Sequence, residues 1–375
     1  MPRINIKIQP NEFYTTNTQS VLLDILSRRD ASNVDYGYIF LGYPNWHQSN
    51  IGLFQYLEKD FINSLCNNKT CLVVDYTYEG FSRIECPIIK ILEDNCVKYN
   101  INPKKIFYFS GNLRDASDLI NVIPIFLLDH ESNFKNLVLD IEKIKKDCAD
   151  NLNDKIILSL SRRNRYYRVL AHAMLFNSSL RDYALISQDT LENFRINDNI
   201  LANIGYNKKL WKRFNKSLPL IADKNQFHIN EPFNYLPELH QSTCFSIENE
   251  TLINDCNQTS LFFSEKILKP IINLQPMIIY GQPGINYGLK KLGYEPYDDY
   301  FDLSFDNEKD DILRYKKLLN SITPVVENLS NSDVNAKIEW RFKNLDKLRH
   351  NFNNFIKQTH SNLAAKEFSK IISKL

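Results

Sequence analysis

Glycine is scarce in this chain, and the glycine-rich loops that usually hold phosphate groups are missing. The 375 residues include ten glycines, and neither G-x-G-x-x-G nor G-x-x-x-x-G-K-[ST] occurs. These two motifs are the common backbone cradles for nucleotide phosphates. If the protein binds a phosphate-containing ligand, basic side chains have to neutralise its charge.

Long apolar runs, cysteine pairs and an excess of charge are also lacking. No run reaches the roughly 18 apolar residues of a membrane span, and the first residues lack the apolar core of a signal peptide. The seven cysteines include no C-x-x-C pair, which argues against a disulfide framework and against structural zinc. The 46 basic and 44 acidic residues nearly cancel, so global charge indicates no nucleic-acid partner. We therefore expect a soluble, cytoplasmic protein with at most peripheral membrane contact.

The chain is long enough for two domains, and both halves alternate strand-like with helix-like segments. Such alternation predicts parallel sheets wrapped by helices, an α/β fold with two Rossmann-like, doubly wound domains. A polar segment at 147–154 lacks periodicity and places a boundary near residue 150. The expected parts are residues 1–150, residues 151–310, and a helical C-terminal extension, 311–375, that packs back on the domains. The strand-like runs are 36–41, 70–75, 105–110, 122–129, 155–160, 183–187, 244–247 and 276–280.

Three blocks in the second half resemble the donor-binding half of bacterial-type α1,3-fucosyltransferases and related glycosyltransferases. FSIEN at 245–249 looks like that family's F-x-F-E-N, FSEK at 263–266 looks like its I-T-E-K, and QPMIIYG at 275–281 falls where the family has V-P-V-V-x-G. The resemblance covers roughly 60 residues, and Ser264 stands where the family has Thr. It implies the two-Rossmann architecture called GT-B and a glycosyltransferase that uses a nucleotide-sugar donor and no other cofactor.

The donor site is expected at strand ends and helix starts in the second domain, where α/β folds bind ligands. Arg162, Arg163 and Arg165 follow a strand and open a helix, so they are candidates for the diphosphate. The resemblance adds Lys266 and Lys269, on a helix that Ser264 is expected to cap. The arginine loop at 162–165 could instead be a solvated basic loop or touch RNA. The candidates for ribose, base or sugar hydroxyls are Glu248, Asn249 and Glu265.

Inverting transfer also needs a base that takes the acceptor proton, and in a two-domain enzyme it should come from the first half. Glu79 is the first candidate, on a loop just past a buried strand. Asp75, nearer the strand end, and His47, beside Trp46, are the rivals. Each of the three could equally be an ordinary surface or core polar residue.

The expected partners are a nucleotide-sugar and a glycan or glycolipid acceptor of surface polysaccharide or glycan synthesis. Asp298, Asp299 and Asp302 could be misread as the D-x-D of a metal-dependent transferase, but their late position indicates a solvated loop, and we expect no bound metal. Two alternatives stay open. One is a transferase of the same fold that uses a cytidine-linked ulosonic acid or a furanose donor, and the other is a non-catalytic carbohydrate-binding module.

Overall fold

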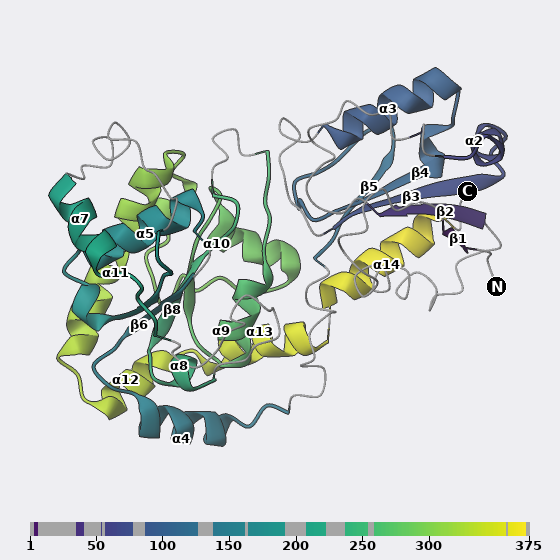
Figure 1. The fold of residues 1–375 in the computed structure, drawn as a ribbon. Coiled ribbons are helices and arrows are strands. Elements are labelled where there is room, and N and C mark those ends of the chain that lie inside the picture. The colour runs from purple at the N-terminus through teal and green to yellow at the C-terminus, as the bar shows by residue number, and fades with distance from the viewer. Residues whose placement is uncertain are drawn as a thin grey trace. The chain divides into compact units, whose positions relative to one another are not determined.

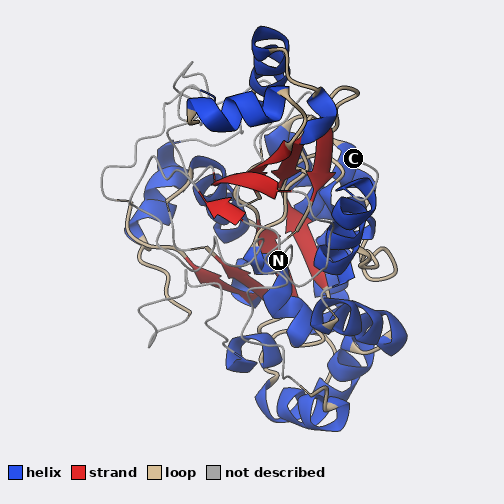
Figure 2. Ribbon diagram, turned by 90° about the vertical axis from the view of Figure 1, so that its right-hand side faces the viewer, coloured by secondary structure: helices blue, strands red, loops and turns tan. Residues whose placement is uncertain are grey.

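The computed structural model shows a mixed α/β protein with two parallel sheets (Figure 1). It describes residues 4–6, 35–40, 54, 57–77, 87–126, 138–161, 164–191, 208–222, 237–253, 259–357 and 359–372. The alternation of strands and helices predicted from the sequence is confirmed, and strands lie among surrounding helices (Figure 2). No described helix is both long enough and apolar enough to cross a membrane.

The chain divides into two compact units, and neither is continuous in sequence. Unit 1 comprises Met1–Glu131, Asn257–Phe263 and Gln358–Leu375, and unit 2 comprises Ser132–Cys256 and Ser264–Lys357. The boundary expected near residue 150 thus lies at 131/132 instead. Helix α4, Ile141–Asn151, lies on the N-terminal side of the expected boundary but packs inside unit 2 with α8, Pro237–Gln241, and α12, Val334–Arg341. Most of the expected C-terminal extension also belongs to unit 2, and only its last helix belongs to unit 1.

The sheet of unit 1 has five parallel strands in the order β1-β2-β3-β4-β5. The central strands are buried on both faces, as the continuous apolar run of β3 requires. Alternate residues separate the faces: Leu72 and Val74 join one core cluster with Leu92 of α3. The elements of this sheet are β1 Ile4–Ile6, β2 Asp35–Phe40, α2 Lys59–Cys66, β3 Thr70–Tyr76, α3 Ile88–Tyr99, β4 Ile106–Ser110 and β5 Asn121–Pro124.

This strand order corrects the expectation that the first domain is doubly wound. Right-handed crossovers between strands that always advance in one direction place their helices on one face, and α2 and α3 lie on the same face (Figure 1). Helix α14, Thr359–Ile372, covers the opposite face. Its Phe368 ring lies 5.0 Å from Phe107 and 5.5 Å from Phe109 of β4. The end of the chain therefore supplies the layer that the winding leaves open.

The sheet of unit 2 has four parallel strands in the order β7-β6-β8-β9, which is doubly wound as expected. Phe245 of β8 packs against Phe301 and Trp340, with ring centroids 5.0 and 5.9 Å apart. The elements are α4, β6 Ile157–Leu160, α5 Tyr166–Phe176, β7 Ala184–Ser187, α7 Lys208–Lys216, α8 Pro237–Gln241, β8 Phe245–Asn249, α9 Leu268–Ile272, β9 Met277–Tyr280, α10 Ile285–Gly288, α11 Asp311–Ser330, α12 Val334–Arg341 and α13 Leu345–Ile356.

Candidate functional site

The candidate site lies in unit 2 at the carboxyl ends of β6 and β8. The strand order reverses between these two strands, because β7 lies on the far side of β6 and β9 on the far side of β8. Ligands of open α/β sheets bind at such a reversal. Ile157 pairs with Phe245 in register, so continuing both strands by four residues puts Ser161 level with Asn249.

Glu250, which is not among the residues predicted for the site, organises the turn that carries Lys266. Its side chain is fully buried and accepts hydrogen bonds from the Ser264 backbone N–H at 2.9 Å and from the Ser264 hydroxyl at 2.6 Å. Ser264 stands at the N-cap position of the 3-10 turn Glu265–Ile267, as expected, but its side chain makes no capping bond. Its hydroxyl donates to Glu250, and its oxygen accepts from the Lys266 ammonium instead of a backbone N–H. The sequence shows Glu250 only as a second acid two positions after Glu248, which by itself does not indicate burial.

Lys266 is held close to this carboxylate but keeps donors available. Its ammonium donates to the Ser264 hydroxyl at 2.7 Å and lies 3.9 Å from Glu250 and 3.5 Å from Glu265. Its side chain is 16% exposed. An ammonium has three N–H donors, so one hydrogen bond at good distance leaves capacity for an anionic ligand. Lys266 and Glu265, both predicted, are thus brought together.

The two predicted glutamates are in different charge environments. Burial raises the pKa of Glu248 to about 7, against the opposing effect of Ser246, Lys266 and Lys269. Burial also acts to raise the pKa of Glu265, but Lys266 and other nearby donors hold it below its ordinary value. Glu248 can therefore gain or lose a proton near neutral pH, whereas Glu265 stays ionised.

Asn249 is oriented by a chain of side-chain hydrogen bonds that starts from a backbone carbonyl bonded to the exposed Asn164 and runs inward. The Thr190 carbonyl can only accept, and it takes a hydrogen bond from Asn164 Nδ2 at 2.6 Å. Asn164 Oδ1 then accepts from Gln188 Nε2 at 2.6 Å, so Gln188 Oε1 faces His172 Nδ1 at 3.0 Å. His172 must carry its proton on Nδ1, which leaves Nε2 to accept from Asn249 Nδ2 at 3.1 Å.

At the strand ends, two buried polar atoms have no hydrogen-bond partner among the described residues. They are Asn249 Oδ1, on a fully buried residue, and Ser161 Oγ, on a residue that is 5% exposed. Burial lowers the pKa of His172 to about 4, so the ring stays neutral and the chain of hydrogen bonds keeps this orientation at neutral pH. Buried polar atoms without a partner are uncommon. A hydroxyl or N–H of a ligand would satisfy the amide oxygen.

The arginine that reaches the site among the described residues is Arg168, not one of the three predicted. Its Nε donates to the carbonyls of Asn249 at 3.1 Å and Glu250 at 3.2 Å, and Nη2 donates to Thr251 Oγ1 at 2.6 Å. Arg168 therefore fixes α5 to the end of β8. Arg165 is half-buried at the start of α5. Arg162 and Arg163 lie outside the described residues.

Among the candidate bases in unit 1, Asp75 is described. It is fully buried at the end of β3 and accepts hydrogen bonds from the Tyr38 hydroxyl and from the Thr77 hydroxyl and backbone N–H. Burial raises the pKa of Asp75. This arrangement ties three polar groups of the fold together and exposes neither carboxylate oxygen. Glu79 and His47 lie outside the described residues.

The acidic loop at 298–302 is not an open carboxylate cluster. Lys347 Nζ donates to Asp298 at 2.9 Å and to Asp299 at 2.5 Å, while Asp302 accepts from the Ser304 backbone N–H at 2.9 Å. Within the described parts of the chain, no group of three His, Cys, Asp or Glu side chains is arranged to hold a metal ion.

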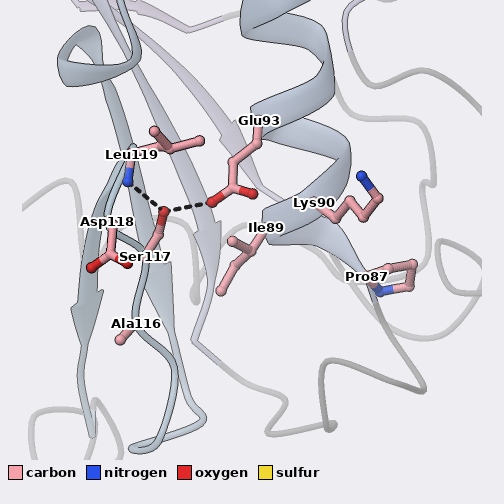
Figure 3. A pocket seen from close by; sticks show the side chains of 8 residues that line it. All are labelled: Pro87, Ile89, Lys90, Glu93, Ala116, Ser117, Asp118 and Leu119. Atoms are coloured by element: carbon pink, nitrogen blue, oxygen red, sulfur yellow. Dashed lines mark hydrogen bonds between the residues drawn. The ribbon is translucent and has the colours of Figure 1, made fainter.

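Unit 1 has a separate open pocket of about 450 Å³ between the first half of α3 and the segment that leads into β5 (Figure 3). The Ser117 hydroxyl donates to Glu93 at 2.6 Å and accepts from the Leu119 N–H at 3.0 Å. These polar groups of the pocket lining therefore already have partners. None of the candidate site residues lines it. The lining residues are Pro87, Ile89, Lys90, Glu93, Ala116, Ser117, Asp118 and Leu119.

No model of a protein family matches the chain, and no curated protein matches it significantly. The indications of function are the geometry of the site and the motif residues at 245–249 and 263–266.

Proposed function

We propose that the protein is a glycosyltransferase of the GT-B type that moves a sugar from a nucleotide-sugar donor to a glycan or glycolipid acceptor. The transfer inverts the anomeric centre, needs no metal, and serves surface polysaccharide or glycan synthesis. The observation that carries this proposal is the gathering of Glu248, Asn249, Glu265 and Lys266 at the strand reversal of unit 2. All four lie in the blocks 245–249 and 263–266 that carry the resemblance.

The roles follow from the chemistry of each group. Departure of a nucleoside diphosphate builds negative charge, and the ammoniums of Lys266 and Lys269 stabilise it. Glu265 stays ionised and accepts hydrogen bonds from hydroxyls, and the Asn249 amide oxygen takes a further donor. Glu250 and Arg168 hold the turn and the strand end, so they position this group without touching the ligand.

Lys266→Ala tests the donor site. Loss of one charge-assisted contact costs roughly 1.5 to 3 kcal/mol, so affinity for nucleoside diphosphate should fall about 10- to 150-fold. Isothermal titration calorimetry with uridine and guanosine diphosphates measures this. Exposed Lys309 provides the matched variant, Lys309→Ala, which should bind like the wild type. Unchanged affinity in a folded Lys266→Ala protein would refute the assignment.

A thermal-shift series with nucleoside diphosphates and with cytidine monophosphate separates this donor class from an ulosonic acid donor. A ligand at about 100 times its dissociation constant adds about 2.7 kcal/mol to stability. Stabilisation by cytidine monophosphate alone would indicate that the site binds a cytidine-linked donor. A site that binds free glycans and no nucleotide would indicate a carbohydrate-binding module.

We assign the acceptor base to Glu79, because Asp75 is buried with both oxygens hydrogen-bonded. Glu79→Gln should lower turnover by roughly 10²- to 10⁴-fold and leave nucleotide affinity nearly intact, because a base acts on the transition state. Turnover is measured as the release of nucleoside diphosphate, and nucleotide affinity is measured by calorimetry. A wild-type rate in Glu79→Gln would move the role to His47, tested next as His47→Ala.

A further inference from the structure

Helix α7, Lys208–Lys216, concentrates positive charge in a way that the donor site does not use. Its sequence KKLWKRFNK contains five basic residues and no acidic residue. All five, Lys208, Lys209, Lys212, Arg213 and Lys216, are exposed. The helix lies beside α5 (Figure 1).

The apolar face of α7 is already occupied by its own unit. Phe214 is fully buried, and its ring lies 5.5 Å from Phe176 of α5, while Trp211 lies 5.8 Å from Phe214. At about 100° per residue, the five basic positions fall within an arc of roughly 140°, opposite Leu210, Trp211 and Phe214. The surface that α7 offers outward is therefore cationic rather than amphipathic.

The excess of positive charge is confined to this helix. The whole chain carries a net charge of +2. Because α7 contributes +5, the remaining 366 residues carry a net charge of −3. A partner that meets only α7 is attracted, whereas a polyanion that wraps the molecule meets a net acidic surface elsewhere.

We propose that α7 docks the protein on an anionic lipid bilayer by electrostatics alone. A flat anionic surface matches a short cationic helix face, and juxtaposed Lys and Arg side chains strengthen membrane binding additively. Single-stranded RNA fits less well, because such sites stack bases on exposed aromatic rings, and the aromatic rings of α7 pack inward. With its apolar face inside the fold, the helix binds at the headgroup surface and does not insert. This docking does not depend on the proposed transferase activity.

The test is co-sedimentation of the full-length protein with vesicles of phosphatidylcholine containing 30% phosphatidylglycerol, in comparison with phosphatidylcholine alone. Binding should need the anionic lipid and should be lost at about 0.5 M salt, where the screening length is only a few ångströms. Lys209→Glu/Lys212→Glu should lower the partition coefficient by about 25-fold or more, since each basic residue contributes about fivefold.

The matched control is Lys143→Glu/Lys146→Glu, which changes net charge equally at two exposed lysines of α4. It should bind vesicles like the wild type, and circular dichroism should show both variants folded. Equal binding to the two lipid mixtures, or equal loss in both variants, overturns the proposal. The proposal is also overturned if Lys209→Glu/Lys212→Glu loses binding to a single-stranded RNA oligonucleotide but binds anionic vesicles like the wild type.

Discussion

Glu248 is the side chain of the candidate site whose charge is most sensitive to pH. Its pKa rises from an ordinary 4.5 to about 7 because it is buried. Between these two values the folded state binds more protons than the unfolded state, so the free energy of unfolding falls as the pH rises through this range. The buried His172 and His240 have pKa values lowered to about 4 and about 3, so below pH 6.5 the unfolded state binds more protons at these two residues. Their contribution therefore lowers the free energy of unfolding as the pH falls below 6.5.

Glu248→Gln should remove the first effect and keep the second. We expect the variant to gain stability relative to the wild type between pH 4.5 and pH 7, by up to about 3 kcal/mol. Urea denaturation of both proteins at pH 5, 6, 7 and 8 measures the difference, in which the histidine contributions cancel. Glu339→Gln, at an exposed position of α12, should give no such trend. Parallel stability curves for Glu248→Gln and the wild type would show that the carboxyl is not desolvated.

Single residues of the site were predictable only where a motif or a strand end marked them. Glu248, Asn249, Glu265 and Lys266 were marked in both ways, and the structure groups them. Glu250 and Arg168 were not, because a charged residue beside a strand or inside a helix is normally exposed. Their burial depends on backbone carbonyls and amides supplied by distant segments, which no local pattern encodes.

At the level of elements, Arg341 of α12 stands in for missing helix caps. It is fully buried and donates to the carbonyls of Asn273 at 2.7 Å, His240 at 2.6 Å and Thr243 at 2.8 Å. These carbonyls lie at or just past the ends of α9 and α8, where helices leave acceptors without internal partners. One guanidinium thus joins the ends of two helices to a third.

Arg341→Leu should destabilise unit 2 by about 3 kcal/mol or more, because it removes the guanidinium donor of the buried Asn273 carbonyl and leaves the His240 and Thr243 carbonyls with the longer, 3.2 Å bonds from Gln275 Nε2. Urea denaturation measures the loss. Arg349→Leu on α13 is the control, since the Arg349 side chain is 46% exposed and lies 3.7 Å from Asp346. It should change stability by less than about 0.5 kcal/mol. Equal costs for the two variants would mean that Arg341 contributes no more than a surface charge.

Strands and helices were predictable to the extent that apolar periodicity determined them. The runs at 70–75 and 105–110 became β3 and β4. Strand β1 was missed, because three residues give no usable period. The buried Lys337, Arg341 and Lys347 were also missed, since their long stems reach carbonyls or carboxylates that sequence order does not reveal.

At the level of the whole molecule, the chain visits unit 1 three times. Residues 257–263 leave unit 2 and return to it at Ser264. In unit 1, Leu113 N–H donates to the Leu261 carbonyl at 2.8 Å, and Leu261 N–H donates to Asn112 Oδ1 at 2.8 Å. A boundary drawn at one polar segment could not find these returns, because they depend on contacts between residues about 150 positions apart.

The last return, helix α14, closes the face of the first sheet that its winding leaves uncovered. Phe368 is 1% exposed and touches β4 through two rings. Phe368→Ala should cost about 3 to 5 kcal/mol of stability, because it opens a cavity against Phe107 and Phe109. Since the contact lies within unit 1, the loss should be confined to that unit.

Hydrogen exchange resolved by mass spectrometry measures this confinement. Peptides of β3, β4 and β5 should exchange faster in Phe368→Ala, while peptides of β6 and β8 keep their wild-type protection. Leu363→Ala, at a position of the same helix that is 55% exposed, should leave both sheets unchanged. Faster exchange in both sheets would mean that the two units unfold together. Unchanged exchange throughout would mean that α14 is not the second layer of the first sheet, and that its open face is covered otherwise.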